Sequence, residues 1–392
     1  MSNDIVIVSA KRTPLGGFQG ELASMQAAEL GAVAIEAAVE TANLSKDDID
    51  LVYMGNVISA GIGQAPARQA ALKAGLSITT PCTTVSKVCG SGMKAVMLAA
   101  DAIALGHADC VVAGGMESMS NAPYLLDKAR SGYRLGHNAV KDSMFVDGLE
   151  DADSGTLMGV FGQRTADKHE FTREQMDDYA IASLQRALTA TEDGSFAAEI
   201  QAVTISTRKG EQTIVEDEQP RNARPDKIPT LKPAFAKEGT VTAANSSSIS
   251  DGAAALVVMS ANACADKNLK PVAVIKAHAV HAQAPDEFTL APIGAIKKVL
   301  EKTTWSVEDV DLFEINEAFA VVTLLAMKEL DIPHEKVNVY GGACAIGHPL
   351  GASGARIIVT LVNALQQNGK RKGVASLCIG GGEATAIAVE LV

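Results

Sequence analysis

Uninterrupted runs of apolar residues are the first pattern along this chain. IVIV at 5–8 and LVVM at 256–259 are apolar at every position, which is typical of strands that are covered on both faces. Ala-rich stretches with helical character occur between such runs. The pattern therefore predicts an α/β protein whose sheets are covered by helices.

One order of segments occurs twice. After Gly90 the chain passes through a Ser-Gly turn, the Ala-rich stretch MKAVMLAADAIAL and the apolar run CVVAGG to Glu117. From Ser353 it passes through a second Ser-Gly turn, then ARIIVTLVNALQQNG and VASLCIGGG, to Glu383. The repeated order of turn, helix, strand and glycine exit predicts an internal duplication with two α/β halves.

Residues 121–240 have a different character. The segments 131–143 and 207–238 are polar, Pro-containing and weakly periodic, which indicates an inserted region. Its middle holds one amphipathic helix, TREQMDDYAIASLQRAL, with Thr172 and Gln175 as a predicted capping box. The predicted apolar face of this helix comprises Met176, Tyr179, Ala180 and Leu184.

Composition narrows the function classes. With 392 residues the chain is long enough for two or three domains, and its 47% hydrophobic residues include only 4% aromatic ones. The net charge of −12 leaves no overall basic field for nucleic acid or an anionic membrane. The first apolar run is too short for a signal-peptide core or a membrane span. We expect a cytoplasmic protein that binds neither nucleic acid nor membranes.

The cysteine and histidine spacings argue against a metal site. Cysteines stand at 82, 89, 110, 264, 344 and 378 without a CxxC pair, which excludes a compact zinc or disulfide framework and favours a reducing cytosol. His278 and His281 form an HxxH pair, but no nearby cysteines or paired carboxylates accompany them. We expect them to be ordinary strand or loop residues and predict no metal.

Cys89 is the first candidate for chemistry. It lies in KVCGSGMKAV, where it is expected to follow a strand and open a helix. The helix N-terminus would then lower the pKa of the thiol below about 8.5. Buried cysteines are commonly inert, which is the interpretation for Cys110, Cys82 and Cys264; Cys344 is also treated as a packing residue.

Three further residues stand on comparable turns. His348 lies in GGACAIGHPLGASGAR, and Cys378 precedes glycines, Gly380 among them, whose amides could act as oxyanion donors. Asn316 in EINEAFA ends an apolar strand, where a helix N-cap is the alternative interpretation. The turns do not match GxGxxG, so no dinucleotide site is expected. Together these residues predict acyl transfer followed by carbon-acid chemistry.

At this point the sequence resembles the thiolase family over essentially its whole length. The motifs that carry the resemblance occur in the family's order: GIGQAPARQA, KVCGSGMKAV, GGMESMSNAPY, GTVTAANSSSISDGAAA, NEAFA, GGACAIGHPLGASGAR and CIGGGEA. The resemblance implies a duplicated βαβαβαββ thiolase fold with mixed five-stranded sheets. It implies one half at 1–120 plus 241–268, a loop domain for coenzyme A (CoA) at 121–240, and a second half at 269–392.

The resemblance also implies the activity of an acetyl-CoA acetyltransferase. Cys89 would be the acylated nucleophile, His348 would activate it, and Cys378 would remove a proton from the methyl carbon of a second acetyl-CoA. Asn316 would hold a water that binds the thioester oxygen together with His348. The amides of Cys89 and Gly380 would form the oxyanion hole of the acyl-enzyme. Acetoacetyl-CoA and CoA would be the products, reversibly, with no prosthetic group.

The family's CoA contacts fall on one set of positions. By resemblance these are Leu149, Met158, Arg221, Phe235, Ala243, Ser247, Ala318 and Phe319. Arg221 opens a segment, 221–237, with five basic residues and one acid, Asp226, which taken alone indicates either a phosphate site or a solvated loop. Arg221 would lie near the adenine and phosphates, with Arg224 as the alternative, and Ser247 would contact the pantetheine arm.

One departure bears on specificity. Short-chain biosynthetic thiolases often carry a histidine before the Met-Gly pair, but this chain has Leu157, and a serine usual in the CoA loop is replaced around Lys227 and Ile228. The alternative is a broader 3-ketoacyl-CoA thiolase of fatty-acid degradation. APIGAIKKVL and ASLCIGGGEATA favour the acetyl-specific interpretation.

Two rival classes remain for comparison. A decarboxylating ketoacyl synthase would need a second His or an Asn in place of Cys378, and a non-catalytic acyl-CoA-binding relative would be expected to have lost Cys89, His348 or Cys378. The family is commonly dimeric or tetrameric. We therefore expect a homotetramer, and the apolar strand CVVAGG with its neighbours could lie near the interface between copies.

Overall fold

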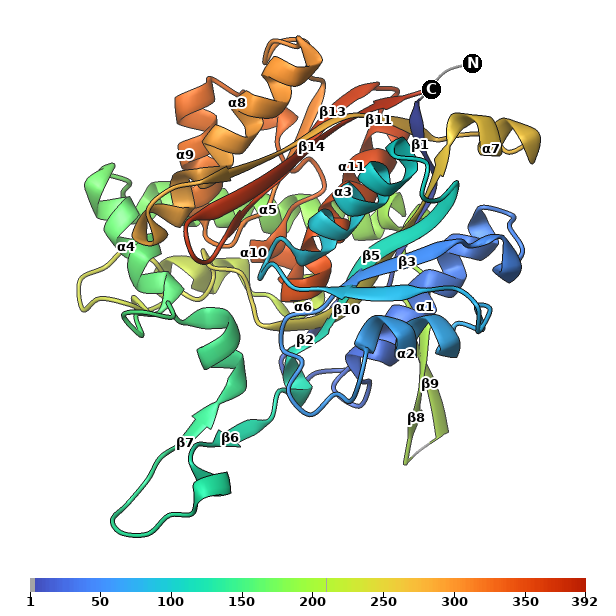
Figure 1. The fold of residues 1–392 in the computed structure, drawn as a ribbon. Coiled ribbons are helices and arrows are strands. Elements are labelled where there is room, and N and C mark those ends of the chain that lie inside the picture. Colours follow the sequence, from blue (N-terminus) through green and yellow to red (C-terminus); the bar gives the residue numbers. More distant parts are fainter. Residues whose placement is uncertain (1–3, 209) are drawn as a thin grey trace.

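The computed structural model describes residues 4–208 and 210–392 (Figure 1). Its centre is one mixed sheet with the strand order β12-β13-β14-β11-β1-β10-β5-β3-β4, and β2 pairs with β10. The first half contributes β1 (Ile5–Arg12), β2 (Gly16–Gly17), β3 (Leu51–Gly55), β4 (Cys82–Val85), β5 (Cys110–Ser118) and β10 (Ser250–Ser260). The second half contributes β11 (Ala273–Ala282), β12 (Leu312–Ile315), β13 (Lys372–Ile379) and β14 (Glu383–Leu391).

The predicted duplication is confirmed by the order of elements. In the first half α1 (Ala27–Thr41), α2 (Pro66–Lys73) and α3 (Ser91–Ala104) connect the strands up to β5. In the second half α8 (Ala291–Thr303), α9 (Ala320–Leu330) and α11 (Leu350–Gln367) connect those up to β13. Each half closes with an antiparallel partner, β10 beside β5 and β14 beside β13.

Two details differ from separate five-stranded sheets. The halves join edge to edge, because β1 pairs with β11 from Ile5 opposite Ile275 to Ile7 opposite Ala273. In the second half, an isolated parallel bridge from Phe313 to Val337 stands where the first half has its β3–β4 pairing. The α/β class is confirmed, and the two sheets form one hydrogen-bonded surface.

Three apolar layers hold the halves together. One cluster packs α1 and α2 against the first half of the sheet, another packs α8 and α9 against the second half, and a central one encloses α3 and α11 between the halves. Alternate residues of β5 enter different clusters: Val111 and Ala113 face α3 and α11, whereas Val112 faces α1. Every residue of β5 is buried within this chain, and the expectation that CVVAGG with its neighbours lies near an interface between copies stays a prediction.

The region between β5 and β10 carries mainly irregular structure. It contains the hairpins β6 (Tyr124–Leu126) with β7 (Val140–Asp142) and β8 (Val203–Thr207) with β9 (Gly210–Ile214), and the helices α4 (Met158–Lys168), α5 (Arg173–Glu192) and α6 (Glu218–Asn222). Short helices α7 (Ala261–Asp266) and α10 (Ala343–Ile346) follow later in the chain. The β6–β7 hairpin extends away from the body (Figure 1). The limits proposed for the three domains stay a prediction.

Helix α5 forms as its sequence predicts. The Thr172 side chain accepts from the Gln175 amide and the Gln175 side chain accepts from the Thr172 amide, which completes the capping box. The four residues predicted for its apolar face are buried: Met176, Tyr179, Ala180 and Leu184.

Candidate active site

Cys89 lies between the end of β4 and the start of α3, as predicted. The residue before it, Val88, has φ +46, a left-handed conformation that is strained for a β-branched side chain. The Gly380 amide donates a hydrogen bond to the Cys89 sulfur. The strained turn therefore presents the thiol to a backbone donor from the other half of the molecule.

The expected acidity of Cys89 is corrected by the structure. The pKa of this thiol is raised to about 11, mainly by burial and to a smaller extent by the nearby Glu117 carboxyl, against the lowering effect of the Gly380 amide. Desolvation disfavours the thiolate more than the helix N-terminus and the amide favour it. Cys89 is thus a neutral thiol in the free protein, so a nucleophilic role would require a base.

His348 precedes α11 and is buried. Its Nδ1 lies 2.5 Å from Ser353 Oγ, and its Nε2 lies 3.5 Å from Asn316 Nδ2. Burial, helped by the positive charge of Arg356, lowers the pKa of His348 to about 3. The imidazole is therefore neutral near pH 7 and able to accept a proton.

Glycines bring the first turns of α3 and α11 into close contact. A Cβ on Gly92 would lie 2.8 Å from the backbone nitrogen of Ala355, and a Cβ on Gly354 would lie 2.4 Å from that of Met93. Cys89 and His348 each precede one of these helices, so the crossing brings their two turns to the same end of the helix pair.

Cys378 is fully buried at the end of β13. Burial raises the pKa of its thiol well above the ordinary value, and the neighbouring Cys89 raises it further. It belongs to the same apolar cluster as Phe319, with Met158 and Phe235 packed against that cluster. The site therefore holds two neutral thiols next to each other beside an apolar wall.

Asn316 follows β12, and its backbone nitrogen donates to the Ser376 carbonyl at 3.0 Å, which fixes the backbone of Asn316 against β13. The alternative interpretation as a helix N-cap does not hold, because α9 begins at Ala320 with Phe319 as its N-cap. The side chain of Asn316 is buried and turned towards His348.

The positions proposed for CoA contacts spread over neighbouring parts of the structure. Leu149 packs with Cys89 against one apolar cluster, and Phe235 meets Phe319 edge to face with ring centroids 6.1 Å apart. The Ser247 amide donates to the Ala318 carbonyl at 2.9 Å. These roles stay predictions.

A cavity of about 330 Å³ lies between α5, α6 and α10. Its lining includes Ala243, Arg224 and Lys227. Arg221 does not line it and instead forms an ion pair with Glu21, with Nη2 and Oε2 2.7 Å apart. Of these two arginines, Arg224, the alternative considered from the sequence, is therefore the one that lies at the cavity.

The remaining cysteines and histidines have structural settings. Cys344 lines the cavity and its backbone amide donates to Glu317 Oε2; its assignment as a packing residue stays a prediction. His278 and His281 lie in β11, as expected of strand residues. Across residues 4–208 and 210–392, no three His, Cys, Asp or Glu side chains form a group suited to a metal ion. No helix in the same ranges has the length and apolarity to cross a membrane.

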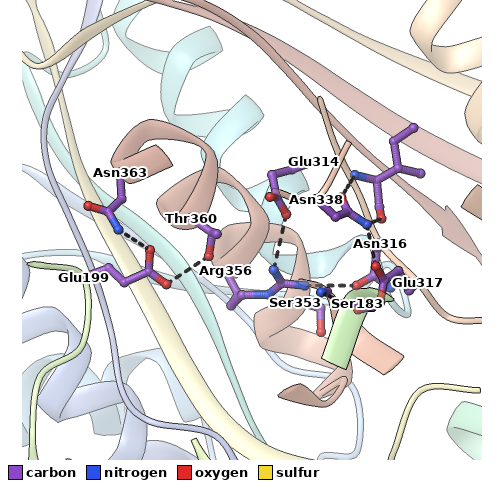
Figure 2. A network of polar contacts seen from close by, with 12 residues as sticks. Ser183, Glu199, Glu314, Asn316, Glu317, Asn338, Ser353, Arg356, Thr360 and Asn363 are labelled. Atoms are coloured by element: carbon purple, nitrogen blue, oxygen red, sulfur yellow. Dashed lines mark hydrogen bonds and ion pairs between the residues drawn. The ribbon is translucent and has the colours of Figure 1, made fainter. Parts of the chain in front are cut away.

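Sequence reasoning missed three polar residues around His348: Ser353, Arg356 and Glu314 (Figure 2). A signal was present, because Arg356 is the one cation in the apolar stretch LGASGARIIVTLVNALQQ and Glu314 interrupts the apolar run LFEI. Charges inside segments that are otherwise buried point to a specific polar role.

Two family models cover almost the whole chain. The thiolase N-terminal domain matches residues 5–262, and the thiolase C-terminal domain matches residues 269–391. The chain belongs to the thiolase family. Cys89 lies in the N-terminal thiolase domain, and the C-terminal thiolase domain contains Asn316, His348 and Cys378.

Relatives and solved structures agree with this membership. A probable acetyl-CoA acetyltransferase of Dictyostelium discoideum is 51% identical over 98% of this chain and 94% of its own length. The mitochondrial acetyl-CoA acetyltransferase of Rattus norvegicus is 50% identical over 99% of this chain and 91% of its own length. The Acat5 thiolase of Ascaris suum, solved in complex with coenzyme A, is 42% identical with a TM-score of 0.94 and covers 99% of this chain and 100% of its own.

Proposed function

We propose that this thiolase is an acetyl-CoA C-acetyltransferase, which joins two acetyl-CoA molecules to acetoacetyl-CoA and CoA through an acetyl group on Cys89. The observation that carries the proposal is the meeting of Cys89, the Gly380 amide and Cys378 at one place, with His348 held by Asn316 at the start of the neighbouring helix. The names and the CoA complex of the relatives support the substrate class.

In the first half-reaction Cys89 attacks the thioester carbonyl. Because the pKa of Cys89 is raised to about 11 and that of His348 is lowered to about 3, the resting pair is neutral. The Cys89 proton moves to His348 Nε2 as the carbon–sulfur bond forms. The bond to CoA then breaks, the CoA sulfur takes the proton of Cys378, and the amides of Cys89 and Gly380 bind the oxyanion.

In the second half-reaction the Cys378 thiolate takes a proton from the methyl group of the next acetyl-CoA. The protonated His348 Nε2, with a water held by Asn316, binds the developing enolate oxygen. The enolate carbon attacks the acetyl group, the bond to Cys89 breaks, and the Cys89 sulfur recovers its proton from His348. Each group ends in its starting state, so the same residues also serve the reverse thiolysis.

For CoA we propose a path from the cavity to the thiols. Arg224 and Lys227 would meet phosphates at the cavity, Ser247 and Ala318 would flank the pantetheine arm, and Phe319 would complete the apolar wall beside Cys378. Leu149, Met158, Phe235 and Ala243 would add apolar contacts, and Arg221 would act at the periphery through its pair with Glu21.

Acetyl specificity is supported by the packing at Cys378. A Cβ on Gly380 would lie 3.4 Å from Met158 Sδ, and Phe235 and Phe319 also pack at this cluster. These apolar side chains border the place proposed for the acyl group. Leu157, in place of a histidine, is the feature that favours the degradative alternative.

We further propose a homotetramer in the cytoplasm. The β6–β7 hairpin exposes Tyr124, Leu126, Leu135 and Val140, which is unusual for a monomer's surface and supports contact with another copy. The six free thiols support a reducing compartment. Size-exclusion chromatography with light scattering and cell fractionation test these two points, with a mitochondrial location as the contrary result.

The activity is tested by intact mass after brief incubation with acetyl-CoA, with peptide mapping and an assay for acetoacetyl-CoA. One acetyl group on the Cys89 peptide, absent in Cys89→Ala, together with acetoacetyl-CoA is expected. An adduct only with longer 3-ketoacyl-CoA donors would instead show the degradative enzyme. No adduct with any donor would favour an acyl-CoA-binding protein.

A further inference from the structure

A buried charge pair, Arg356 with Glu314, lies next to the side-chain amide of Asn316 (Figure 2). Arg356 on α11 is 1% exposed, and its Nη2 lies 3.5 Å from Asn316 Oδ1. Its Nη1 lies 3.5 Å from Glu314 Oε2 on β12. Because Asn316 in turn contacts His348, a charged group is connected to the imidazole through one side-chain amide.

This charge pair is not arranged in a way that would stabilise the fold strongly. Arg356 Nε and Nη1 and Glu314 Oε1 are buried without hydrogen-bond partners in the described part of the chain. Burial also raises the pKa of Glu314 to about 8, so its carboxylate compensates the guanidinium incompletely. Well-packed apolar residues are often as stable as such a pair, so its presence calls for another role.

The chain contains its own comparison. The Ser-Gly turns at 91–92 and 353–354 are equivalent, and the glycines of both turns meet the other helix in the same way, so the residue of α3 that corresponds to Arg356 is Lys94. The first half therefore also carries a cation at this position, but Lys94 is partly exposed whereas Arg356 is buried.

The contact with Arg356 decides which way the Asn316 amide points. A guanidinium has only donors, so the amide oxygen has to face Arg356 and the NH₂ group has to face His348. His348 Nε2 must then accept, which puts the imidazole proton on Nδ1, where it is donated to Ser353 Oγ. The Ser353 hydroxyl donates onward to the Pro349 carbonyl at 2.9 Å. With the amide reversed, every one of these roles would reverse as well.

We propose that Arg356 is a positioning residue that fixes the orientation of the Asn316 amide and thereby the tautomer of His348 whose Nε2 can accept the Cys89 proton. The proposal rests on the proposed function, because in that function the lone pair of His348 Nε2 accepts the Cys89 proton. Arg356 itself touches no substrate. Its positive charge also helps to keep the imidazole neutral before acylation.

The test is a double-mutant cycle on the rate of Cys89 acetylation, measured in single turnovers by rapid quench and mass spectrometry. Arg356→Met removes the donors at similar volume, and we expect the acetylation rate to fall on the order of 10²-fold with KM for acetyl-CoA nearly unchanged. Asn316→Ala should cost a similar factor. In Arg356→Met/Asn316→Ala the two losses should not multiply, because Arg356 acts through Asn316.

Three further variants guard against a trivial explanation. Arg356→Lys keeps a cationic donor and should recover part of the rate. Arg356→Met combined with Glu314→Leu leaves no unpaired buried charge, so it should fold, and it should remain slow. Thr360→Val, one turn further along α11, loses a hydrogen bond to Glu199 without contacting Asn316 and should acetylate at the normal rate.

Two outcomes would overturn the proposal: a normal acetylation rate in the charge-free double variant, or multiplied losses in the cycle. Failure of the proposed function is seen separately, as the absence of any acetyl group on Cys89 in the unaltered protein.

Discussion

Replacing Glu317 by Gln should destabilise the fold although it changes a single atom. The Glu317 carboxylate is buried and accepts four hydrogen bonds, from the Tyr179 hydroxyl and Asn338 Nδ2 at Oε1 and from the Ser183 hydroxyl and the Cys344 amide at Oε2. These contacts attach α5 of the inserted region to the β12 and α10 segments next to Asn316.

The magnitude follows from the donors. A glutamine has one acceptor oxygen, so its NH₂ group must face either Asn338 Nδ2 or the Cys344 amide, neither of which can turn into an acceptor. The hydroxyls of Tyr179 and Ser183 can rotate and accept instead. One buried donor is therefore left without a partner at about 1–3 kcal/mol, and the loss of charge weakens the remaining bonds, giving about 2–4 kcal/mol in total.

The assay is urea unfolding followed by fluorescence and circular dichroism, at one fixed protein concentration because assembly would add to apparent stability. Glu335→Gln makes the same chemical change on the exposed helix at His334–Lys336 and should stay within about 0.5 kcal/mol of the parent. Hydrogen exchange should also increase in α5 for the Glu317 variant. A stability equal to that of the Glu335 variant would refute the reasoning that a carboxylate is required.

Three other outcomes follow from the site. Arg224→Gln should raise KM for acetyl-CoA about 10-fold by removing a cation at the cavity, whereas Arg221→Gln should change it less, as steady-state kinetics will show. Because burial raises the pKa of Cys89 to about 11, its thiol stays protonated up to that pH. The rate of Cys89 alkylation by iodoacetamide, followed by peptide mass, should therefore keep rising between pH 8 and pH 10. A rate that reaches a plateau near pH 7 would contradict this. Gly354→Ala should cost at least about 1–3 kcal/mol and lower kcat, since its Cβ would lie 2.4 Å from the Met93 backbone nitrogen; an unchanged urea midpoint would show that the helices can separate freely.

Local patterns predicted much of the fold. Runs such as IVIV and LVVM became β1 and β10, and the two turn–helix–strand units became α3 with β5 and α11 with β13. The capping box at Thr172 and Gln175 formed as written. These features depend on neighbours within one turn or one strand, and that information is contained in a short stretch of sequence.

Features that depend on distant partners were beyond those patterns. The join of the two sheets pairs Ile5 with Ile275, and no local signal gives that register. The acidity of Cys89 was predicted in the wrong direction because the helix N-terminus is visible in the sequence, whereas the degree of desolvation depends on what packs around the thiol. Arg224 lies only three residues from Arg221, and only the fold separates the cavity from the surface pair with Glu21.

The duplication explains how one site arose from two similar halves. Asn56 follows β3 as Asn316 follows β12, but Asn56 Nδ2 donates to Glu117 Oε1 at 2.8 Å and so serves a structural carboxylate. In the second half the corresponding asparagine is turned between Arg356 and His348. In the proposed reaction the first half would supply the nucleophile and the second half its base, because equivalent positions carry different polar partners on a common backbone.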